Sequence, residues 1–343
     1  MVGFIAQVCK RDWNATANAS KLKQMSQSSL ELKALVTGGA GFIGSHIAQA
    51  LVAKGAQVVV LDDLSTGDAD ANLAWVGAND RVEFVKGCIT NVTLVKKIIQ
   101  GCQWVFHEAA IASVPQSVAQ PLESNAINLE ASLNLLVAAR EAQVKRFMFA
   151  SSAAIYGDSV APLKHESDSV LPLTPYGLQK YGSERYGQMF HHLYGLETVS
   201  LRYFNVFGPR QSFTSAYSGV IAKFCTLMLA GKAPTIFGDG LQSRDFAYID
   251  NVVAANLLAA ERPAENVAGR VFNVAGGASV SLLDLIAELN QLTGQALVPT
   301  HQPARTGDIR DSAADLSAAR LDLGYDTRIS WQDGLKETLN FYR

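Results

Sequence analysis

The sequence lacks a pronounced excess of either charge. Its 29 basic and 31 acidic residues leave a formal net charge of -2 over 343 residues. That balance argues against a surface that binds nucleic acid or an anionic membrane through charge. Charged residues make up 17% of the chain and hydrophobic residues 48%, which is typical of a globular protein with a large core. We therefore expect a small-molecule partner, with neither nucleic acid nor membrane.

Cysteine is scarce, and the few cysteines are scattered. They are Cys9, Cys88, Cys102 and Cys225. Zinc sites use closely spaced pairs, and a chain of this size needs no disulfide framework. The pattern therefore predicts no metal site, and it is typical of a protein of the reducing cytoplasm.

Long apolar runs are also missing. No run approaches the ~20 residues that a membrane-spanning helix needs. Near the start, the apolar stretch of residues 2–8 is shorter than the core of a secretory signal, and it precedes Lys10 and Arg11 instead of following them. We expect residues 1–32, which are rich in Ser, Ala and Gln, to form a polar N-terminal arm.

From Lys33 onwards, short β-branched runs alternate with longer amphipathic segments. This alternation predicts an α/β fold, a Rossmann-type doubly wound parallel sheet with helices on both faces. The expected helices include residues 42–54, 124–142 and 176–194, where apolar residues recur every three or four positions. The expected strands are residues 34–37, 57–61, 82–86, 104–108, 146–150, 197–203 and 270–274.

After Asn205 the alternation gives way to connections rich in Gly, Pro and Ser. This change predicts a smaller C-terminal α/β substrate lobe. We expect residues 33–204, joined by residues 241–278, to form the larger domain that contains this sheet. Residues 205–240 and 279–343 are expected to form the lobe, with the ligand in a cleft between the two.

A glycine-rich loop with the spacing G-x-x-G-x-x-G follows the first expected strand. Gly38 permits a tight turn, Gly41 lets backbone amides approach a pyrophosphate, and Gly44 lets the next helix pack closely on the strand. Flexible loops also contain such glycines. The strand before, the helix after and the acidic pair Asp62-Asp63 at the end of the next strand favour a dinucleotide site.

Asp62 stands 18 positions after Gly44. A carboxylate at about this spacing accepts hydrogen bonds from the adenosine ribose and repels a 2′-phosphate, which favours NAD over NADP. Two interpretations of Asp63 stay open. It is either a further ribose contact or a solvated turn residue, a common place for Asp.

Tyr176 and Lys180 are four positions apart on an expected helix, so their side chains share one face. An ammonium near a phenol lowers the pKa of the phenol, which suits a general base. Ser152 follows the strand of residues 146–150, at the edge of the sheet where sites form. Each feature alone is common on surfaces or in turns. Their order after one cofactor loop predicts a catalytic set.

The motifs at residues 37–44, 61–67, 151–157, 175–180, 202–209, 238–246 and 305–308 together resemble those of the extended short-chain dehydrogenase/reductase family. The resemblance runs from about Lys33 to the C-terminus and is specific for members that act on nucleotide sugars. It implies that Tyr176 is the base, that Lys180 holds the nicotinamide ribose and lowers the tyrosine pKa, and that Ser152 contacts the sugar 4-hydroxyl.

The resemblance also implies the binding residues. Asn205, Arg244 and Arg305 would hold the nucleotide diphosphate, and Phe237 and Asp308 would surround uracil and ribose. The cofactor contacts that it implies are Gly38, Gly41, Phe42, Ile43, Gly44, Asp62, Asp63, Ser65, Thr66, Gly67, Ile89, Ala109, Ala110, Asn125, Tyr176, Lys180 and Tyr203. The substrate contacts that it implies are Ser113, Ser152, Asn205, Gln211, Phe237, Arg244, Arg305, Asp308 and Ser312.

One position departs from the family pattern. Cys88 stands where the family usually has an aspartate that touches the adenine amino group. Either the cofactor binds more weakly than in the family, or another polar group takes over this contact.

The segment after Ser152 bears on the reaction. Related dehydratases and decarboxylases carry carboxylates there, whereas this chain has Ala153 and Ala154. The resemblance therefore implies reversible 4-epimerisation of a UDP-hexose through a 4-keto sugar. Ser312 stands where a bulky tyrosine marks enzymes confined to glucose and galactose, and residues 113–117 resemble a loop of epimerases for N-acetylated sugars. UDP-GlcNAc/UDP-GalNAc is the favoured substrate pair.

Other interpretations stay open. They are a UDP-glucose/UDP-galactose 4-epimerase, a decarboxylase or dehydratase of the same scaffold, and, in a different class, a non-enzymatic NAD-binding sensor, since a fold does not fix a function. A sensor would be expected to lose Ser152, Tyr176 and Lys180, which are all present. The resemblance further implies a homodimer that pairs through the helices of residues 124–142 and 176–194.

Overall fold

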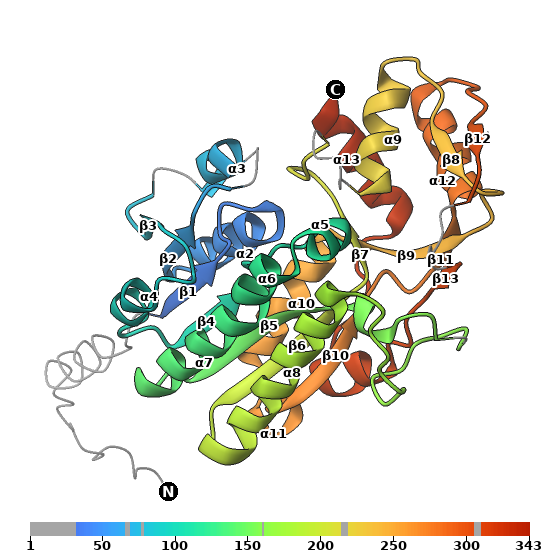
Figure 1. The fold of residues 1–343 in the computed structure, drawn as a ribbon. Coiled ribbons are helices and arrows are strands. Elements are labelled where there is room, and N and C mark those ends of the chain that lie inside the picture. Colours follow the sequence, from blue (N-terminus) through green and yellow to red (C-terminus); the bar gives the residue numbers. More distant parts are fainter. Residues whose placement is uncertain (1–31, 66–68, 77–78, 160, 214–218, 305–309) are drawn as a thin grey trace, which may run out of the picture. The chain divides into compact units, whose positions relative to one another are not determined.

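The computed structural model describes the chain except residues 1–31, 66–68, 77–78, 160, 214–218 and 305–309 (Figure 1). Lys33–Arg343 form one compact unit, which is described below. The arm predicted for residues 1–32 lies, but for its last residue, outside the described residues.

A parallel sheet of seven strands organises this unit, and the predicted fold class is confirmed (Figure 1). The strand order is β10-β6-β5-β4-β1-β2-β3, so the chain turns back between β1 and β4. Every predicted strand is present, and the boundaries differ from the prediction by two residues at most. The strands are β1 Lys33–Thr37, β2 Gln57–Asp62, β3 Val82–Lys86, β4 Trp104–His107, β5 Arg146–Ser152, β6 Glu197–Tyr203 and β10 Arg270–Val274.

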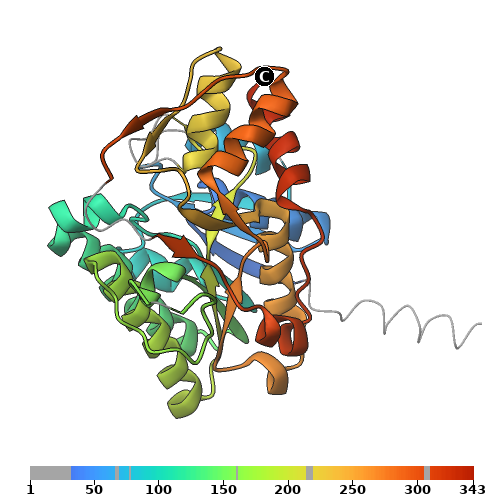
Figure 2. The same cartoon turned by 90° about the vertical axis from the view of Figure 1, so that its right-hand side faces the viewer.

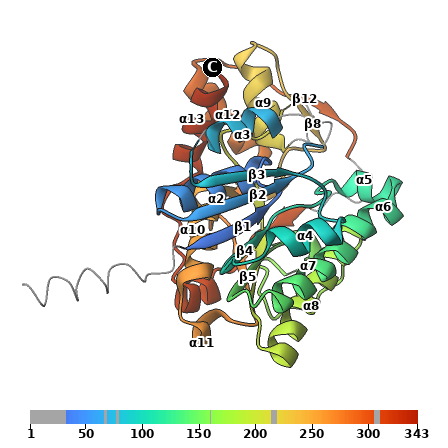
Figure 3. The same ribbon diagram turned by 90° about the vertical axis from the view of Figure 1, so that its left-hand side faces the viewer.

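Helices cover both faces of the sheet (Figures 1 and 3). One face carries α4 Val92–Ile98, α7 Ala131–Glu141 and α8 Pro175–Tyr194, and the other carries α2 Phe42–Ala53 and α10 Ile249–Glu261. The predicted helix of residues 124–142 is divided into α6 Pro121–Asn125, a π-helical turn at Ala126–Glu130 and α7. The short elements are α3 Ala69–Val76, α5 Val114–Ala119, the 3-10 turn Ala153–Tyr156, α11 Ala264–Val267 and a second π-helical turn at Ala319–Leu323.

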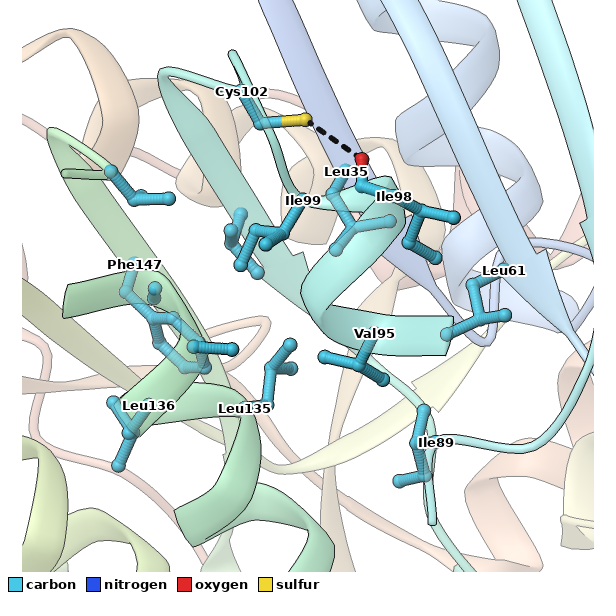
Figure 4. Packing of buried hydrophobic residues seen from close by; sticks show 14 of the residues in the cluster. Leu35, Leu61, Ile89, Val95, Ile98, Ile99, Cys102, Leu135, Leu136 and Phe147 are labelled. Carbon is cyan, nitrogen blue, oxygen red and sulfur yellow. Dashed lines mark hydrogen bonds between the residues drawn. The ribbon is translucent and has the colours of Figure 1, made fainter. Parts of the chain in front are cut away.

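The main core lies between the sheet and the helices α4 and α7. Figure 4 shows Leu35 and Phe147 from the strands packed against Val95 and Ile98 of α4 and Leu135 of α7. Strands buried on both faces favour Val, Ile and Leu. Each such side chain contributes about 1.5–3 kcal/mol when it is fully buried. This packing fixes where the strands end, and therefore where the residues after them lie.

A second, smaller set of elements lies beyond the carboxyl ends of the large sheet (Figure 2). Residues 241–278 were predicted to return to the large domain; α10, α11 and β10 do so, whereas β9 does not. The reason is that β9 pairs with β7, which follows β6 almost directly, and so joins a second sheet. The second sheet contains β7 Asn205–Phe207, β9 Ser243–Tyr248, β11 Ser279–Ser281 and β13 Asp311–Ser312. A third sheet pairs β8 Thr235–Phe237 with β12 Thr300–Gln302. Three helices pack on one another beside these sheets: α9 Val220–Leu229, α12 Leu282–Thr293 and α13 Trp331–Tyr342.

Candidate active site

The glycine-rich loop has the geometry that its spacing predicts. Gly38 has a φ of +66°, and a Cβ there would lie 2.7 Å from the Ala109 backbone nitrogen. A Cβ on Gly44 would lie 2.2 Å from the Gly38 carbonyl oxygen. Neither position has room for a side chain, because the loop passes directly between the ends of β1 and β4. The loop leads into α2 at its N-terminus, which is a favourable place for an anion.

A cavity of about 270 Å³ lies beside this loop. It is placed where the strand order reverses, which is where open α/β sheets bind ligands. The predicted cofactor residues that line it are Gly38, Gly41, Phe42, Ile43, Gly44, Asp62, Asp63, Ser65, Ile89, Ala109 and Ala110. Cys88 lines it as well. Thr66 and Gly67 lie outside the described residues.

Asp62 is fixed at the end of β2. Its carboxylate accepts hydrogen bonds from the Ala40 amide at 3.0 Å and the Leu64 amide at 2.8 Å. Burial raises the pKa of this carboxyl, and these amide hydrogen bonds oppose the rise. The Asp63 carboxylate is exposed and accepts from the Ser65 amide at 3.0 Å. Asp63 thus lines the cavity and stabilises a turn, so both interpretations of it remain compatible with its place.

A second cavity, of about 320 Å³, contains the predicted catalytic set. Ser152, Tyr176 and Lys180 all line it, although they come from β5 and α8. The two cavities adjoin, because both are lined by Ile43, Glu108, Ala110 and Ala112. A cofactor in the first cavity can therefore reach a ligand in the second.

The start of α8 is held tightly, which places Tyr176. Thr174 caps the helix by accepting from the Gly177 amide at 3.2 Å. A Cβ on Gly177 would lie 2.8 Å from the Ala154 carbonyl oxygen, so the helix packs directly on the turn that follows Ser152. The Tyr176 amide donates to the Ser117 hydroxyl at 3.2 Å. These contacts bring the phenol to the end of β5.

Burial has the largest effect on the pKa of both Tyr176 and Lys180. The Lys180 ammonium donates to the Ala150 carbonyl at 2.8 Å and lies 5.9 Å from the centre of the Tyr176 ring. Burial raises the pKa of Tyr176 above its ordinary value, and a hydrogen bond with Ser152 opposes that rise. Burial lowers the pKa of Lys180 to about 8. In this structure burial therefore dominates both groups.

The structure does not bring Asn125 to either cavity. Its side chain is exposed and lines neither cavity, whereas Asn128, one turn later, is 1% exposed. Asn128 accepts from the Ile111 amide at 2.8 Å and donates to the Ile111 carbonyl at 3.1 Å and the Gln179 side chain at 2.9 Å. Helical spacing could have identified it. Asn128 shares a buried face with Ser124 and Ser132, four positions to either side.

Two residues at the end of β4 went unassigned in the sequence. Glu108 lines both cavities. His107 is buried between Thr37, whose hydroxyl lies 2.7 Å from Nδ1, and Ser132, whose hydroxyl lies 2.8 Å from Nε2. Burial lowers the pKa of His107 to about 3, so it is neutral and serves as a polar link between β1, β4 and α7. An acidic residue directly after an apolar strand, as at Asp62, is the signal that could have found Glu108.

The substrate residues divide into two groups. Asn205 and Gln211 line the second cavity together with Ser152, and the cofactor residue Tyr203 lines it as well. The side-chain amide of Gln211 donates to the Val206 carbonyl at 3.0 Å, which fixes the segment after β7.

The remaining substrate residues do not line either cavity. Arg244 and Ser312 lie opposite each other in the pairing of β9 with β13, and Arg244 donates to the Arg310 carbonyl at 3.1 Å. Phe237 is the last residue of β8, and Ser113 caps α5 by accepting from the Gln116 amide at 3.1 Å. Arg305 and Asp308 lie outside the described residues.

Two further searches cover only the part of the chain that the structure describes. Within it, no group of three or more His, Cys, Asp or Glu side chains is placed to hold a metal ion. Among the same residues, no helix combines the length and the apolar character that crossing a bilayer requires.

Comparison with known proteins gives close relatives over most of the chain. This chain is 37% identical over 314 residues to the UDP-glucose 4-epimerase of Mycolicibacterium smegmatis, and the match covers 91% of this chain and 99% of that protein. The structure of the Thermotoga maritima UDP-glucose 4-epimerase with UDP-glucose superimposes with a TM-score of 0.85 at 39% identity, covering 91% and 99% of the two chains. A UDP-N-acetylglucosamine 4-epimerase from Methanobrevibacter ruminantium gives a TM-score of 0.83 at 38% identity, covering 91% and 98%.

The family model described as the NAD dependent epimerase/dehydratase family matches residues 34–275. That span includes the glycine-rich loop, both cavities' catalytic and cofactor residues and the return of the chain to the large sheet. The resemblance found in the sequence motifs is thereby confirmed. The chain belongs to the NAD dependent epimerase/dehydratase family.

Proposed function

We propose that this protein is a UDP-sugar 4-epimerase that uses bound NAD, and that its substrate pair is UDP-GlcNAc and UDP-GalNAc. The observation that carries the proposal is the position of Ser152, Tyr176 and Lys180 in one cavity that adjoins the cavity of the glycine-rich loop. A 4-epimerase needs a proton acceptor and a reversible hydride acceptor at the same carbon. Adjoining cavities meet that need.

The first cavity fits NAD. Gly41 would let backbone amides approach a pyrophosphate at the start of α2, and Asp62 offers a carboxylate for the adenosine ribose. Lys180 would hold the nicotinamide ribose. A UDP-glucuronic acid 4-epimerase from Bacillus cereus, a related structure, was solved with NAD. When bound, NAD supplies the reversible hydride acceptor next to the sugar.

The chain's own residues would handle the proton. Tyr176 accepts the proton of the sugar 4-hydroxyl, and Ser152 holds that hydroxyl by a hydrogen bond. Because burial raises the pKa of Tyr176, its phenolate requires positive charge nearby, and the Lys180 ammonium is the buried cation on the same helix face. After the 4-keto sugar has rotated in the cavity to present its opposite face, Tyr176 returns the proton to the oxygen on C4.

The turn after Ser152 supports epimerisation over dehydration or decarboxylation. Ala153 and Ala154 occupy it, and the Ala154 amide donates to the Ser152 hydroxyl at 3.2 Å. These alanines supply no acid or base for elimination at neighbouring carbons. The substrate carbon that reacts is therefore the one within reach of Tyr176.

The proposed preference for an acetylated sugar rests mainly on Ser312. Ser312 is a small residue in β13, opposite Arg244, and it would leave room for a 2-acetamido group where a tyrosine would fill it. The relatives also support a second candidate, the UDP-glucose/UDP-galactose pair, because the Thermotoga maritima structure contains UDP-glucose at 39% identity.

One experiment separates these candidates. Purified protein is incubated with UDP-GlcNAc or with UDP-glucose, and the anomeric protons are followed by NMR. Conversion of UDP-GlcNAc to UDP-GalNAc, reaching the same plateau from either sugar, supports the proposal. Conversion of UDP-glucose alone selects the second candidate. Failure of both sugars, with NAD bound, contradicts epimerase function and leaves a decarboxylase, a dehydratase or an NAD-binding sensor.

We also propose that the protein is a cytoplasmic homodimer that pairs through α8 and the helical segment of residues 124–142. Leu178, Met189 and Leu193 of α8 are 59%, 43% and 62% exposed, which is unusual for three large apolar side chains on one helix. Light scattering measures the mass of the particle in solution. A dimer that Leu193→Glu converts to a monomer supports the proposal, and a monomeric wild type contradicts it.

A further inference from the structure

Glu108 occupies the point where the two cavities meet. It follows β4 directly, beside the reversal of the strand order, and four residues line both cavities: Ile43, Glu108, Ala110 and Ala112. Only Glu108 among them carries a charge. In the proposed function, this is the place where the reactive end of the cofactor reaches the sugar. Any charge here acts on that end at short range.

The Glu108 carboxylate is anchored from the far side. It accepts a hydrogen bond from the Tyr203 hydroxyl at 2.9 Å, and that hydroxyl accepts from the Asn256 amide at 2.7 Å. Tyr203 is 8% exposed and Asn256 is 1% exposed. These two hydrogen bonds, made by residues of β6 and α10, hold the Glu108 carboxylate in place. Glu108 is therefore part of a fixed network and not a mobile surface acid.

Two titratable groups of α8 face Glu108. The carboxylate raises the pKa of Lys180 against the effect of burial, and it raises the pKa of Tyr176. The Tyr203 hydroxyl of β6 also faces the Glu108 carboxylate. His107, the residue before Glu108, is hydrogen-bonded to Thr37 and Ser132 instead and stays neutral. Burial raises the pKa of Glu108 itself to about 7, while Tyr203 and Lys180 oppose the rise. The carboxyl therefore changes charge near neutral pH.

We propose that Glu108 is a positioning residue that makes the site prefer the oxidised, positively charged nicotinamide over the neutral, reduced one. This inference rests on the proposed use of NAD. The Lys180 ammonium alone would repel a second positive charge in a buried site. A carboxylate held between them compensates both charges, and so keeps the cofactor in the form that can accept a hydride.

The sign of the pH dependence follows. The oxidised ring favours the ionised form of Glu108, so the preference for NAD over NADH should rise with pH between about 6 and 8. The reduced ring carries no charge and gives no such drive. The pKa of Lys180 is about 8, so loss of its proton adds a second rise at higher pH. Because the Glu108 carboxylate raises the pKa of Lys180, Glu108→Gln should move this second rise to lower pH.

The test is a competition between cofactor forms on the purified holoenzyme. Protein is incubated with an equal mixture of NAD and NADH until exchange is complete and freed of unbound cofactor, and the two bound forms are quantified by mass spectrometry. Glu108→Gln keeps the size and the contact with Tyr203. We expect it to lower the bound NAD/NADH ratio ~10-fold, as removal of one nearby buried charge implies, and to flatten the ratio between about pH 6 and 8. Glu108→Asp should retain part of the pH dependence.

The control is Glu265→Gln, which removes an exposed carboxylate on α11. It should bind the two forms in the wild-type ratio. A Glu108→Gln protein with an unchanged ratio and an unchanged pH profile overturns the inference. Tyr203→Phe, which frees the carboxylate without removing it, should shift the ratio less than Glu108→Gln does. A wild type that shows the pH-dependent ratio but epimerises no UDP-sugar contradicts the proposed function and leaves the inference about Glu108 standing.

Discussion

The cofactor side and the substrate side of this site are built by different means. On the cofactor side, short segments at the ends of β1, β2, β3 and β4 line the cavity, and Gly38 and Gly44 have no room for a side chain. On the proposed substrate side, Arg244 lies on β9 of a second sheet, and Asn205 and Ser312 lie on β7 and β13, the strands that pair with β9. The first kind of site is specified locally, and the second depends on the tertiary fold.

The largest effect should come from Tyr176, the proposed proton acceptor on the substrate side. Tyr176→Phe removes the proton acceptor but keeps the ring and the packing of α8. We expect kcat to fall roughly 10²- to 10⁴-fold, the usual contribution of a positioned acid or base, with NAD still bound. The measurement is the rate of UDP-sugar conversion, with bound NAD determined after denaturation. A variant that keeps most of its activity would exclude Tyr176 as the base.

On the cofactor side, adding a single methyl group to the glycine-rich loop should abolish NAD binding. In Gly44→Ala the new Cβ would lie 2.2 Å from a backbone oxygen that cannot move independently, so the loop must shift. We expect loss of bound NAD and a lower Tm. Gly182→Ala in α8 is the matched control, because its Cβ meets only the flexible Leu129 side chain at 2.9 Å. Equal NAD content in the two variants would show that the loop is not the cofactor site.

The substrate side should tolerate a larger change with a selective result. Ser312→Tyr is expected to reduce activity on UDP-GlcNAc roughly 10- to 100-fold, since a bulky ring would occupy the space of the acetamido group. Activity on a non-acetylated UDP-hexose should change little. The exposed Ser317→Tyr serves as the control on the same segment. A uniform loss on both sugars would mean that Ser312 supports the fold and does not select the substrate.

The two sides should also respond to pH with opposite signs. His107 is neutral when folded, so below its unfolded pKa of about 6.5 the unfolded chain takes up a proton and stability falls as the pH decreases towards 3. Burial raises the pKa of Asp245 to about 6, so its stabilising contribution, fully present below about pH 4, is lost as the pH rises to 6.

Urea unfolding at several pH values measures these slopes. His107→Asn should flatten the acid side by up to about 1.4 kcal/mol per pH unit, and Asp245→Asn should remove the opposing trend between about pH 4 and 6. Neither slope changing would show that other groups control the pH dependence of stability.

The smallest effect concerns the departure at Cys88, which lines the cofactor cavity. Cys88→Asp restores a carboxylate for the adenine amino group. We expect a gain in NAD affinity of about fivefold, the equivalent of one added hydrogen bond. Cys88→Ser, which offers only a hydroxyl, should gain less. A weaker affinity in Cys88→Asp would show that the cavity is closed to a charge at this position.

The comparison of the two sides also explains what the sequence could predict. The large sheet, the glycine-rich loop and the triad of Ser152, Tyr176 and Lys180 follow from local spacing, because strand periodicity and helix phase place them. Asn125 is exposed, whereas Asn128 has the helix phase of the buried face that Ser124 and Ser132 share. The return of β9 to a second sheet depends on strand pairing over long distances, which no local pattern records. The same holds for Glu108, whose partners are Tyr203 and Asn256.

The central claim is that two adjoining cavities bring a proton acceptor and a hydride acceptor to the same sugar carbon. UDP-GlcNAc carrying deuterium at C4 tests it most directly. The account predicts that the product UDP-GalNAc, measured by mass spectrometry and NMR, keeps the deuterium at C4, because the hydride is removed and returned within the site. Loss of the label to water would contradict a hydride mechanism and assign the residues around Tyr176 to another chemistry.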